Sequence, residues 1–130
     1  MNISFIGGGN MASALIGGLV AQGFDAAHIR VIDVARETRE ALQARYPVRA
    51  FAHLDAEAVA ADIIVLAVKP QQLREVATSL SPLLQKQLVI SIAAGVRAED
   101  LSRWLGGYRQ LVRSMPNTPA MVSAGMSGLY

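Results

Sequence analysis

Residues 3–12 read Ile-Ser-Phe-Ile-Gly-Gly-Gly-Asn-Met-Ala, an apolar strand that leads into three glycines and then into a helix-forming segment. Gly7 allows the backbone to turn sharply, Gly9 leaves no side chain between backbone and phosphate, and Ala12 is small enough for close packing of helix on strand. The amides and the partial positive charge at the start of that helix suit an anion. This G-x-G-x-x-A pattern indicates a dinucleotide diphosphate site, although by itself it fits equally well a turn that binds nothing.

The segments that follow complete a strand–helix–strand unit. A helix is predicted over residues 11–22, where apolar residues recur at four-residue spacing from Met11 onward. A second strand is predicted over residues 30–34. It contains Asp33, 21 residues beyond Ala12, close to where this kind of unit places an acid against the adenosine ribose.

Strands and helices keep alternating along the rest of the chain. Further helices are predicted over residues 36–46, 55–61, 71–80 and 98–105, and further strands over residues 48–51, 63–68, 88–92 and 110–115. This alternation predicts an α/β fold with a doubly wound parallel sheet of Rossmann type and right-handed crossovers. We expect a single dinucleotide-binding domain over residues 1–130.

Composition agrees with such a domain and argues against several other classes of protein. Of the 130 residues, 52% are hydrophobic and 17% are charged, which suits a sheet covered on both faces. A net charge of +2 and 5% aromatic residues do not favour a nucleic-acid partner. No apolar run approaches the ~20 residues needed to cross a membrane. Because cysteine is absent, disulfides and thiolate metal sites are excluded, and we expect a cytoplasmic protein without a metal centre.

Several loops should meet at one edge of the sheet, because ligands of such folds bind at the carboxyl ends of the strands. These loops are residues 7–11, 33–36, 67–70, 93–96 and 115–119. The last reads Met-Pro-Asn-Thr-Pro, in which two prolines stiffen the backbone while Asn117 and Thr118 can hydrogen-bond to a ligand. The same residues fit equally well a rigid turn whose polar groups cap their own backbone.

Four segments together carry a resemblance to a known family. They are Phe-Ile-Gly-Gly-Gly-Asn-Met-Ala at 5–12, Ala-Val-Lys-Pro at 67–70, Ser-Ile-Ala-Ala-Gly-Val at 91–96 and Met-Pro-Asn-Thr-Pro at 115–119. In their order and spacing the chain resembles pyrroline-5-carboxylate reductase along essentially its whole length. The resemblance implies an oxidoreductase that reduces 1-pyrroline-5-carboxylate, a cyclic imino acid, to L-proline with NADPH or NADH in the last step of proline biosynthesis.

The resemblance also implies roles for individual residues. The diphosphate would be held by Gly7, Gly8, Gly9, Asn10, Met11 and Ala12. The ribose and nicotinamide would lie along Ala67, Val68, Lys69 and Pro70, and the nicotinamide ring would be bordered by Ala93, Ala94 and Gly95. The imine pocket would be walled in part by Met115, Pro116, Asn117, Thr118 and Pro119.

Members of that family are roughly twice as long as this chain. Their carboxyl-terminal half is a helical domain that forms the dimer and completes the active site. The resemblance therefore implies a homo-oligomer assembled through that second domain, and residues 1–130 alone are expected to bind cofactor without turning over substrate.

No catalytic residue is assigned from the sequence. An imine protonated on nitrogen is already electrophilic, so the protein mainly has to hold its carbon near the nicotinamide in a water-poor pocket. Tyr108, His28 and His53 could act as acids, but each is expected to be a surface or packing residue, and neither histidine is expected in a carboxyl-end loop. Lys69 precedes a proline, so it should be extended and contact a phosphate or the backbone.

Charges near the second strand bear on the choice of cofactor. Asp33 could accept a hydrogen bond from the 2′-hydroxyl of NAD and would repel a 2′-phosphate, whereas Arg36 and Arg39 could bind that phosphate. The attraction of two arginines for a 2′-phosphate could offset its repulsion by one aspartate whose side chain points away. NADP is therefore favoured, while NAD stays possible. Alternatively, Arg36 pairs with Glu40 on a solvated helix face.

Two other functions fit the glycine turn. One is a non-catalytic NAD(P)-binding sensor, which would not need the stiff polar loop at residues 115–119. The other is a hydroxyacid dehydrogenase of the 3-hydroxyisobutyrate type, which would carry a catalytic lysine beyond the residues present here.

Overall fold

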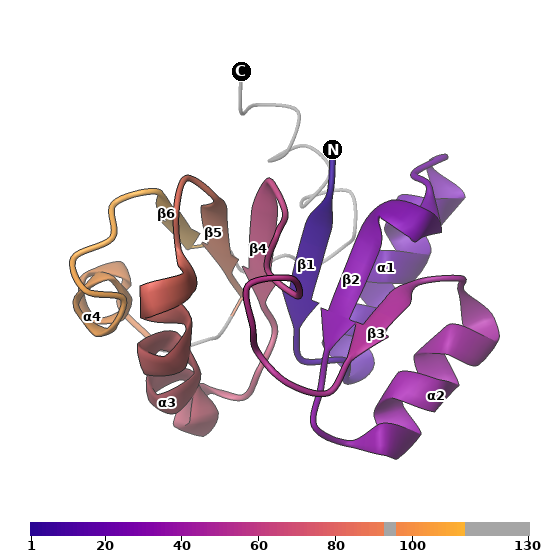
Figure 1. Cartoon of the computed structure of the whole chain (residues 1–130), viewed down its shortest axis with the longest axis horizontal. Coiled ribbons are helices and arrows are strands. Elements are labelled where there is room, and N and C mark those ends of the chain that lie inside the picture. Colours follow the sequence, from indigo (N-terminus) through magenta and orange to yellow (C-terminus); the bar gives the residue numbers. More distant parts are fainter. Residues whose placement is uncertain (93–95, 114–130) are drawn as a thin grey trace.

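The computed structural model describes residues 1–92 and 96–113 and shows a six-stranded parallel sheet in the order β3-β2-β1-β4-β5-β6 (Figure 1). The strands are β1 (Ile3–Ile6), β2 (Ile29–Ile32), β3 (Arg49–Phe51), β4 (Ile63–Leu66), β5 (Leu88–Ser91) and β6 (Leu111–Arg113). Central β1 pairs with β2 on one side and with β4 on the other, so the strand order reverses there. A reversal of this kind is the point at which ligands bind in doubly wound sheets.

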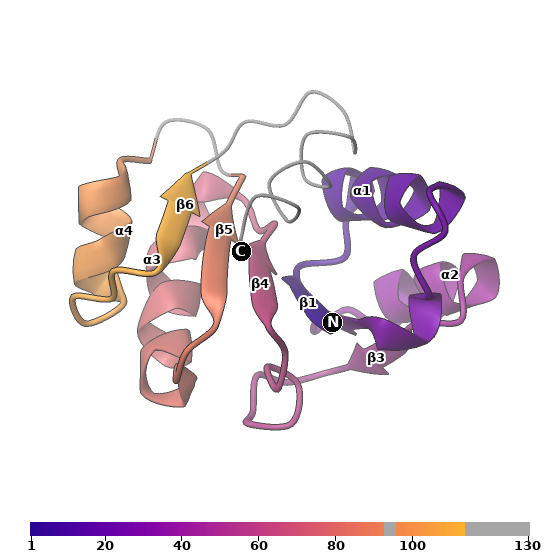
Figure 2. The same ribbon diagram turned by 90° about the horizontal axis from the view of Figure 1, so that it is seen from above.

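Helices cover both faces of the sheet. They are α1 (Asn10–Ala21), α2 (Arg36–Arg45), α3 (Pro70–Leu80) and α4 (Ala98–Trp104), with short 3₁₀ turns η1 (Ala26–His28) and η2 (Ser81–Leu83). Figure 2 shows α1 and α2 on one side of the sheet and α3 and α4 on the other. The predicted doubly wound parallel sheet of Rossmann type is confirmed.

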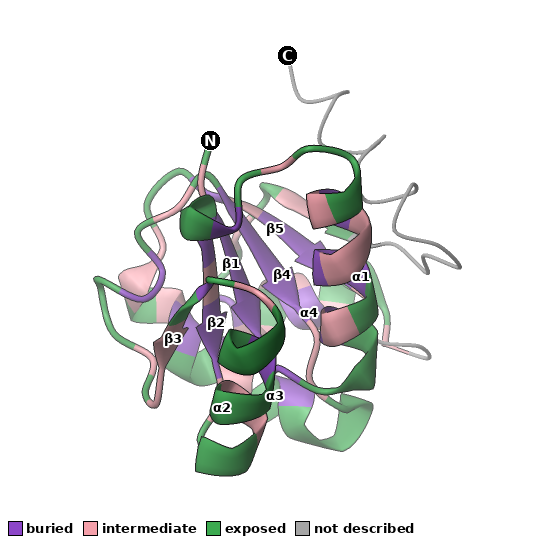
Figure 3. Ribbon diagram, turned by 90° about the vertical axis from the view of Figure 1, so that its right-hand side faces the viewer, coloured by how far each residue is buried: buried purple, intermediate pink, exposed green. Residues whose placement is uncertain are grey.

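The sheet separates two apolar clusters, because successive side chains of a strand point to opposite faces. The cluster under α1 and α2 includes Phe5, Leu15 and Leu42, which are almost completely buried. The cluster under α3 and α4 includes Leu73 and Leu101. Figure 3 shows the buried strands between helices whose outer surfaces are exposed. Burial on both faces explains why the strands are almost uninterrupted apolar runs.

The elements around the glycine turn differ slightly from their predicted bounds. Helix α1 begins at Asn10, one residue earlier than predicted, and Met11 is 50% exposed rather than part of the core. Within the first turn of α1 it is Ala12 that is completely buried, whereas Met11 is exposed. Strand β2 ends at Ile32, so Asp33 lies in the loop that follows the strand.

The predicted helix over residues 55–61 is wrong. The Asp55 carboxylate accepts a hydrogen bond from the Ala58 amide at 2.8 Å, and the Val59 amide donates to the Asp55 carbonyl at 3.2 Å. The Ala61 amide then donates to the Val59 carbonyl at 2.8 Å, so the helical pattern ends after one turn. One turn makes too few hydrogen bonds to offset the cost of helix nucleation, and burial of Ala58 and Val59 fixes the segment instead.

The remaining elements agree with the predicted bounds to within a few residues. Helix α3 begins at Pro70, one residue earlier than predicted, and ends at Leu80 as predicted, where the 3₁₀ turn η2 follows it. The turn η1 was not predicted. The last residues of the predicted sixth strand, 114 and 115, lie outside the described residues. Within the described part of the chain, no helix is long and apolar enough to span a membrane.

Candidate dinucleotide site

The first glycine of the turn makes a close backbone crossing possible. Gly7 has φ +101°, in the region that side-chain-bearing residues avoid. A Cβ atom at this position would lie 2.9 Å from the Ala67 carbonyl oxygen. The Gly7 amide donates to the Ile32 carbonyl at 2.8 Å, which extends the pairing of β1 with β2 by one residue. Gly7 therefore lies close to the ends of both strands that pair with β1.

The second and third glycines have opposite surroundings. A Cβ atom on Gly8 would lie 2.9 Å from Leu42 Cδ1 and 3.0 Å from Thr38 Cγ2, both on α2. Gly8 is buried and serves the packing of the turn against that helix. A Cβ atom on Gly9 would meet nothing within 4 Å, and Gly9 is exposed. The open side of the turn is thus at Gly9, where a phosphate could approach the backbone.

The start of α1 is free to bind an anion. Gly9 is the N-cap residue and has no side chain to accept the first amides of the helix, while Asn10 and Met11 are exposed. The first internal bond of the helix is from the Ser13 amide to the Gly9 carbonyl at 2.9 Å. Ala12 is completely buried, as the close packing of α1 on the sheet requires. These features fit a diphosphate bound by backbone amides.

Asp33 faces the turn, but both of its carboxylate oxygens already accept hydrogen bonds from the backbone. Oδ2 accepts from the Gly8 amide at 2.9 Å, and Oδ1 accepts from the Ala35 amide at 2.8 Å. The sequence placed Asp33 correctly beside the turn. No pattern in the sequence indicated that the Asp33 carboxylate would accept hydrogen bonds from both the glycine turn and the loop after β2.

The two arginines after β2 differ in what they bind. Arg36 is exposed, and its Nε donates to Glu40 Oε1 at 2.8 Å, as in the alternative that paired these residues on a solvated helix face. Arg39 is partly buried, and its guanidinium donates to the carbonyls of Asp33 and Val34 at 2.8 and 3.2 Å. Arg39 therefore holds the loop in place, and Arg36 is the cation that a 2′-phosphate could draw away from Glu40.

The loop after β4 lies against the glycine turn. The Ala67 amide donates to the Ile6 carbonyl at 2.8 Å, and Ala67 and Val68 are half-buried. Lys69 has φ −66° and ψ 150°, the extended conformation predicted for a residue before proline. Lys69 and Pro70 are exposed at the start of α3. These residues lie where a ribose beside the diphosphate would pass.

A cavity of about 360 Å³ opens at the carboxyl ends of β1, β2 and β3, next to Gly7 and Asp33. His53 lines it together with Val34 and Val68. Placing both histidines away from the carboxyl-end loops was therefore wrong for His53. The available signal was its position two residues after β3, whose end the sequence placed correctly at Phe51. Val34, in the predicted loop at residues 33–36, is 83% exposed.

Several predicted site residues lie outside the described residues. These are Ala93, Ala94 and Gly95 after β5, and Met115, Pro116, Asn117, Thr118 and Pro119 after β6. Their roles at the nicotinamide and imine stay predictions.

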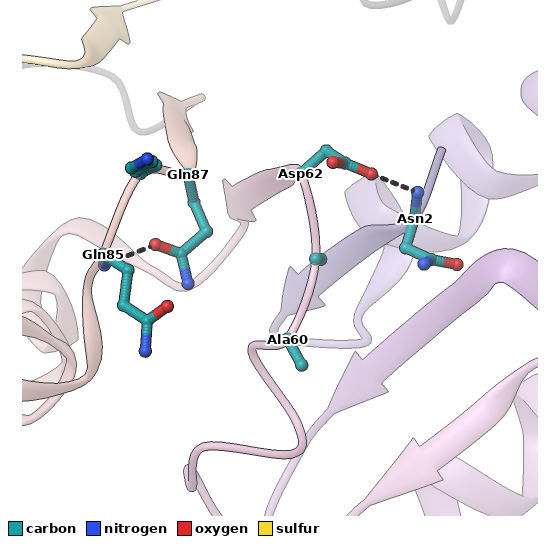
Figure 4. Close-up of a pocket in the computed structure, with 7 residues that line it drawn as sticks. Asn2, Ala60, Asp62, Gln85 and Gln87 are labelled. Carbon is teal, nitrogen blue, oxygen red and sulfur yellow. Dashed lines mark hydrogen bonds between the residues drawn. The ribbon is translucent and has the colours of Figure 1, made fainter.

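A second cavity lies before the first residues of β1, β4 and β5, whereas the glycine turn follows the last residue of β1. Figure 4 shows residues that line this cavity. The cavity measures about 370 Å³ and is lined by Asn2, Asp62 and Gln87 among others. Asp62 accepts from the Asn2 amide at 2.8 Å, and the Gln87 side chain accepts from the Gln85 amide at 2.7 Å and donates to the Val59 carbonyl at 3.0 Å. These polar groups bind one another, which explains their presence without a ligand.

The other titratable residues considered from the sequence have structural partners. The Tyr108 hydroxyl donates to the Gln87 carbonyl at 2.5 Å, and burial raises the pKa of Tyr108. His28 Nδ1 lies 3.1 Å from Asn2 Oδ1 at the amino end of the sheet. Both residues are remote from the turn, as expected of packing and surface residues.

With this geometry established, comparison with known proteins identifies the family. The family model described as "NADP oxidoreductase coenzyme F420-dependent" matches residues 2–95, which include the glycine turn, Asp33 and the loop after β4. The chain belongs to this family.

Relatives within the family confirm the resemblance stated from the sequence. The pyrroline-5-carboxylate reductase of Pseudomonas aeruginosa is 50% identical over 130 residues, which cover 98% of this chain and 47% of the relative. The structure of a pyrroline-5-carboxylate reductase from Coxiella burnetii matches with a TM-score of 0.82 at 40% identity, over 93% of this chain and 46% of that one. Plasmodium falciparum pyrroline carboxylate reductase with NADP bound matches with a TM-score of 0.76 at 28% identity, over 94% and 44%. The chain thus spans about half the length of the relatives it matches.

Proposed function

We propose that this chain forms the dinucleotide-binding half of an NADPH-dependent reductase that converts 1-pyrroline-5-carboxylate to L-proline. The observation that carries the proposal is the open turn at Gly9, which precedes the uncapped start of α1. The chain that contains this turn is 50% identical, over 98% of its residues, to a pyrroline-5-carboxylate reductase. The bound NADP of the Plasmodium falciparum relative supports the choice of cofactor.

In this proposal the chain's own residues bind and orient the cofactor. The amides of Gly9, Asn10 and Met11 hold the diphosphate, and the cavity beside Val34 and His53 takes the adenosine. The loop from Ala67 to Pro70, half-buried at one end and exposed at the other, then runs along the ribose toward the nicotinamide. When bound, NADPH supplies the hydride that reduces the imine carbon.

The substrate side of the site is proposed from sequence alone. Residues 93–95 would border the nicotinamide and residues 115–119 would wall the imine pocket. We further propose that dimerisation and completion of the active site reside in the half of the relatives' length that this chain does not span. A cytoplasmic location, expected from the lack of cysteine, stays a prediction.

The test separates binding from turnover. Residues 1–130 should bind NADPH in a fluorescence titration yet form no proline from 1-pyrroline-5-carboxylate. Joining them to the carboxyl-terminal half of the Pseudomonas aeruginosa relative should produce proline with consumption of NADPH. Failure to bind NADPH would end the proposal, proline formation by residues 1–130 alone would contradict the division of labour, and binding without turnover in the joined protein would favour a sensor.

A further inference from the structure

The pairing of β1 with β2 continues past the ends of both strands. The Gly7 amide donates to the Ile32 carbonyl at 2.8 Å, as it would inside a sheet. At the next residue the turn diverges from β2, and the Gly8 amide donates at 2.9 Å to the Asp33 carboxylate instead of to a backbone carbonyl. The side chain of Asp33 thus takes the place of a backbone carbonyl as the acceptor of the next hydrogen bond between the two segments.

Asp33 is itself fixed from two further directions. Its amide donates to the Phe51 carbonyl of β3 at 3.0 Å, and its second carboxylate oxygen accepts from the Ala35 amide at 2.8 Å. Its carbonyl accepts from the Arg39 guanidinium at 2.8 Å. Each carboxylate oxygen therefore already accepts one backbone hydrogen bond before any ligand arrives.

The glycine turn is held between this carboxylate and α2. On its other side Gly8 lies so close to Leu42 and Thr38 that an added Cβ atom would come within 2.9 and 3.0 Å of them. The amide of Gly8 is consequently committed to Asp33. The amides that remain for a diphosphate are those that follow, at Gly9 and the first turn of α1, where Gly9 is open.

We propose that Asp33 is a positioning residue for the diphosphate: its carboxylate orients the glycine turn so that the next amides face the ligand, and it does not select the ribose 2′-hydroxyl. The inference rests on the proposed function only in that the chain binds a dinucleotide. It differs from the sequence interpretation, in which Asp33 accepts from the 2′-hydroxyl of NAD. The two roles can be separated with ligands of equal charge.

The first test compares ADP with 2′-deoxy-ADP on the unaltered chain by isothermal titration calorimetry. A positioning role predicts dissociation constants that agree within about twofold, because no hydrogen bond to the 2′-hydroxyl is lost. A charge-assisted hydrogen bond from that hydroxyl would instead favour ADP by roughly tenfold or more. A ratio of that size would overturn the proposal, and the measurement needs no variant to fold.

The second test uses Asp33→Asn and Asp33→Ala, which are equally neutral, with 2′-deoxy-ADP as the ligand. The amide oxygen of asparagine can still accept from Gly8 or Ala35, so a positioning role predicts at least fivefold tighter binding by Asp33→Asn than by Asp33→Ala. If Asp33 only bound the 2′-hydroxyl, the two variants would bind this ligand equally. Equal binding would therefore overturn the proposal.

The matched control is Asp25→Ala. Asp25 accepts from the amide two residues later at 2.9 Å, just as Asp33 accepts from Ala35, but it lies before β2 at the opposite end of the strand. Its loss should leave the affinity for 2′-deoxy-ADP within about twofold of the unaltered chain, and a larger loss would count against a role particular to Asp33.

Absence of any ADP binding would overturn this inference together with the proposed function, whereas ADP binding without reductase activity in the joined protein would refute only the proposed function.

Discussion

At the scale of single residues, the three glycines of the turn serve three different purposes. Gly7 permits a positive φ and a close crossing of Ala67, Gly8 permits packing of the turn on α2, and Gly9 leaves the ligand side open. Only the last of these purposes concerns the cofactor directly. Substitutions at Gly8 and Gly9 should therefore separate stability from binding.

Gly9→Ala should abolish most NADPH binding while leaving the fold intact. The added methyl group meets no protein atom within 4 Å but occupies the space that the diphosphate needs. We expect the free energy of unfolding to change by less than about 0.5 kcal/mol, as for other surface substitutions. Gly8→Ala should instead lower it by about 1–3 kcal/mol through overpacking. Urea unfolding and NADPH titration check both, and NADPH affinity unchanged in Gly9→Ala would contradict the site.

Arg36→Ala should weaken NADPH binding roughly tenfold and leave NADH binding unchanged, because a charge-assisted bond to the 2′-phosphate is lost. Glu40→Gln is the companion variant, since it removes the ion-pair partner of Arg36 without touching the arginine. It should leave NADPH binding equal or tighter. Titration of NADPH and of NADH into both variants measures these affinities. An unchanged NADPH affinity in Arg36→Ala would contradict binding of the 2′-phosphate by Arg36.

At the scale of elements, short connections fix the ends of the strands. The segment after α4 shows this: the Ser102 hydroxyl donates to the Tyr108 carbonyl at 2.7 Å, while the Tyr108 hydroxyl reaches the Gln87 carbonyl before β5. Tyr108 thereby ties the start of β5 to the loop that leads to β6. Its contribution to stability should depend on its protonation.

Tyr108→Phe should lower the free energy of unfolding by about 1 kcal/mol, the usual contribution of one hydrogen bond. Burial raises the folded-state pKa of Tyr108 above its unfolded value near 10, so the stabilising effect is complete below about pH 10 and is lost as the pH rises through the folded-state pKa. Urea unfolding of both proteins from neutral to strongly alkaline pH should show a constant difference that then shrinks. A difference that grows with pH would contradict this sign.

At the scale of the whole molecule, one sheet joins two cores. Ile16 belongs to the cluster under α1 and α2, and Ile64 to the cluster under α3 and α4, and both are completely buried. The backbone of the sheet lies between the two clusters, so a cavity in one should not relax into the other. The molecule should nevertheless unfold as a single unit, as small domains usually do.

Ile16→Val and Ile64→Val should each cost about 0.5–1.5 kcal/mol, as is typical of removing one buried methylene. The double variant should show the sum of the two to within about 0.3–0.5 kcal/mol, because the sites share no partners. Urea unfolding followed by circular dichroism and by Trp104 fluorescence should give coincident transitions. Separate transitions for the two probes would contradict a single cooperative unit.

How much of this could be predicted from the sequence depends on the range of the interactions involved. The βαβ unit, the parallel arrangement of the strands and the position of Asp33 after the second strand follow from local patterns of apolar residues and glycines, and the structure agrees with them. The helix over residues 55–61 was wrong because burial of Ala58 and Val59 outweighed local propensity. The position of His53 two residues after β3 could have placed it at the carboxyl edge of the sheet, but its neighbours in the cavity come from other parts of the chain.

By itself, the sequence determined that an apolar strand enters a glycine turn and a helix, because those preferences belong to the backbone of consecutive residues. Only the tertiary structure decided what each glycine is close to and what the Asp33 carboxylate binds. Gly8 meets α2, and Asp33 reaches Gly8 across 25 positions of sequence. The physical reason is that hydrogen bonds and packing depend on distances in space, which the folded sheet sets by bringing the ends of β1 and β2 side by side.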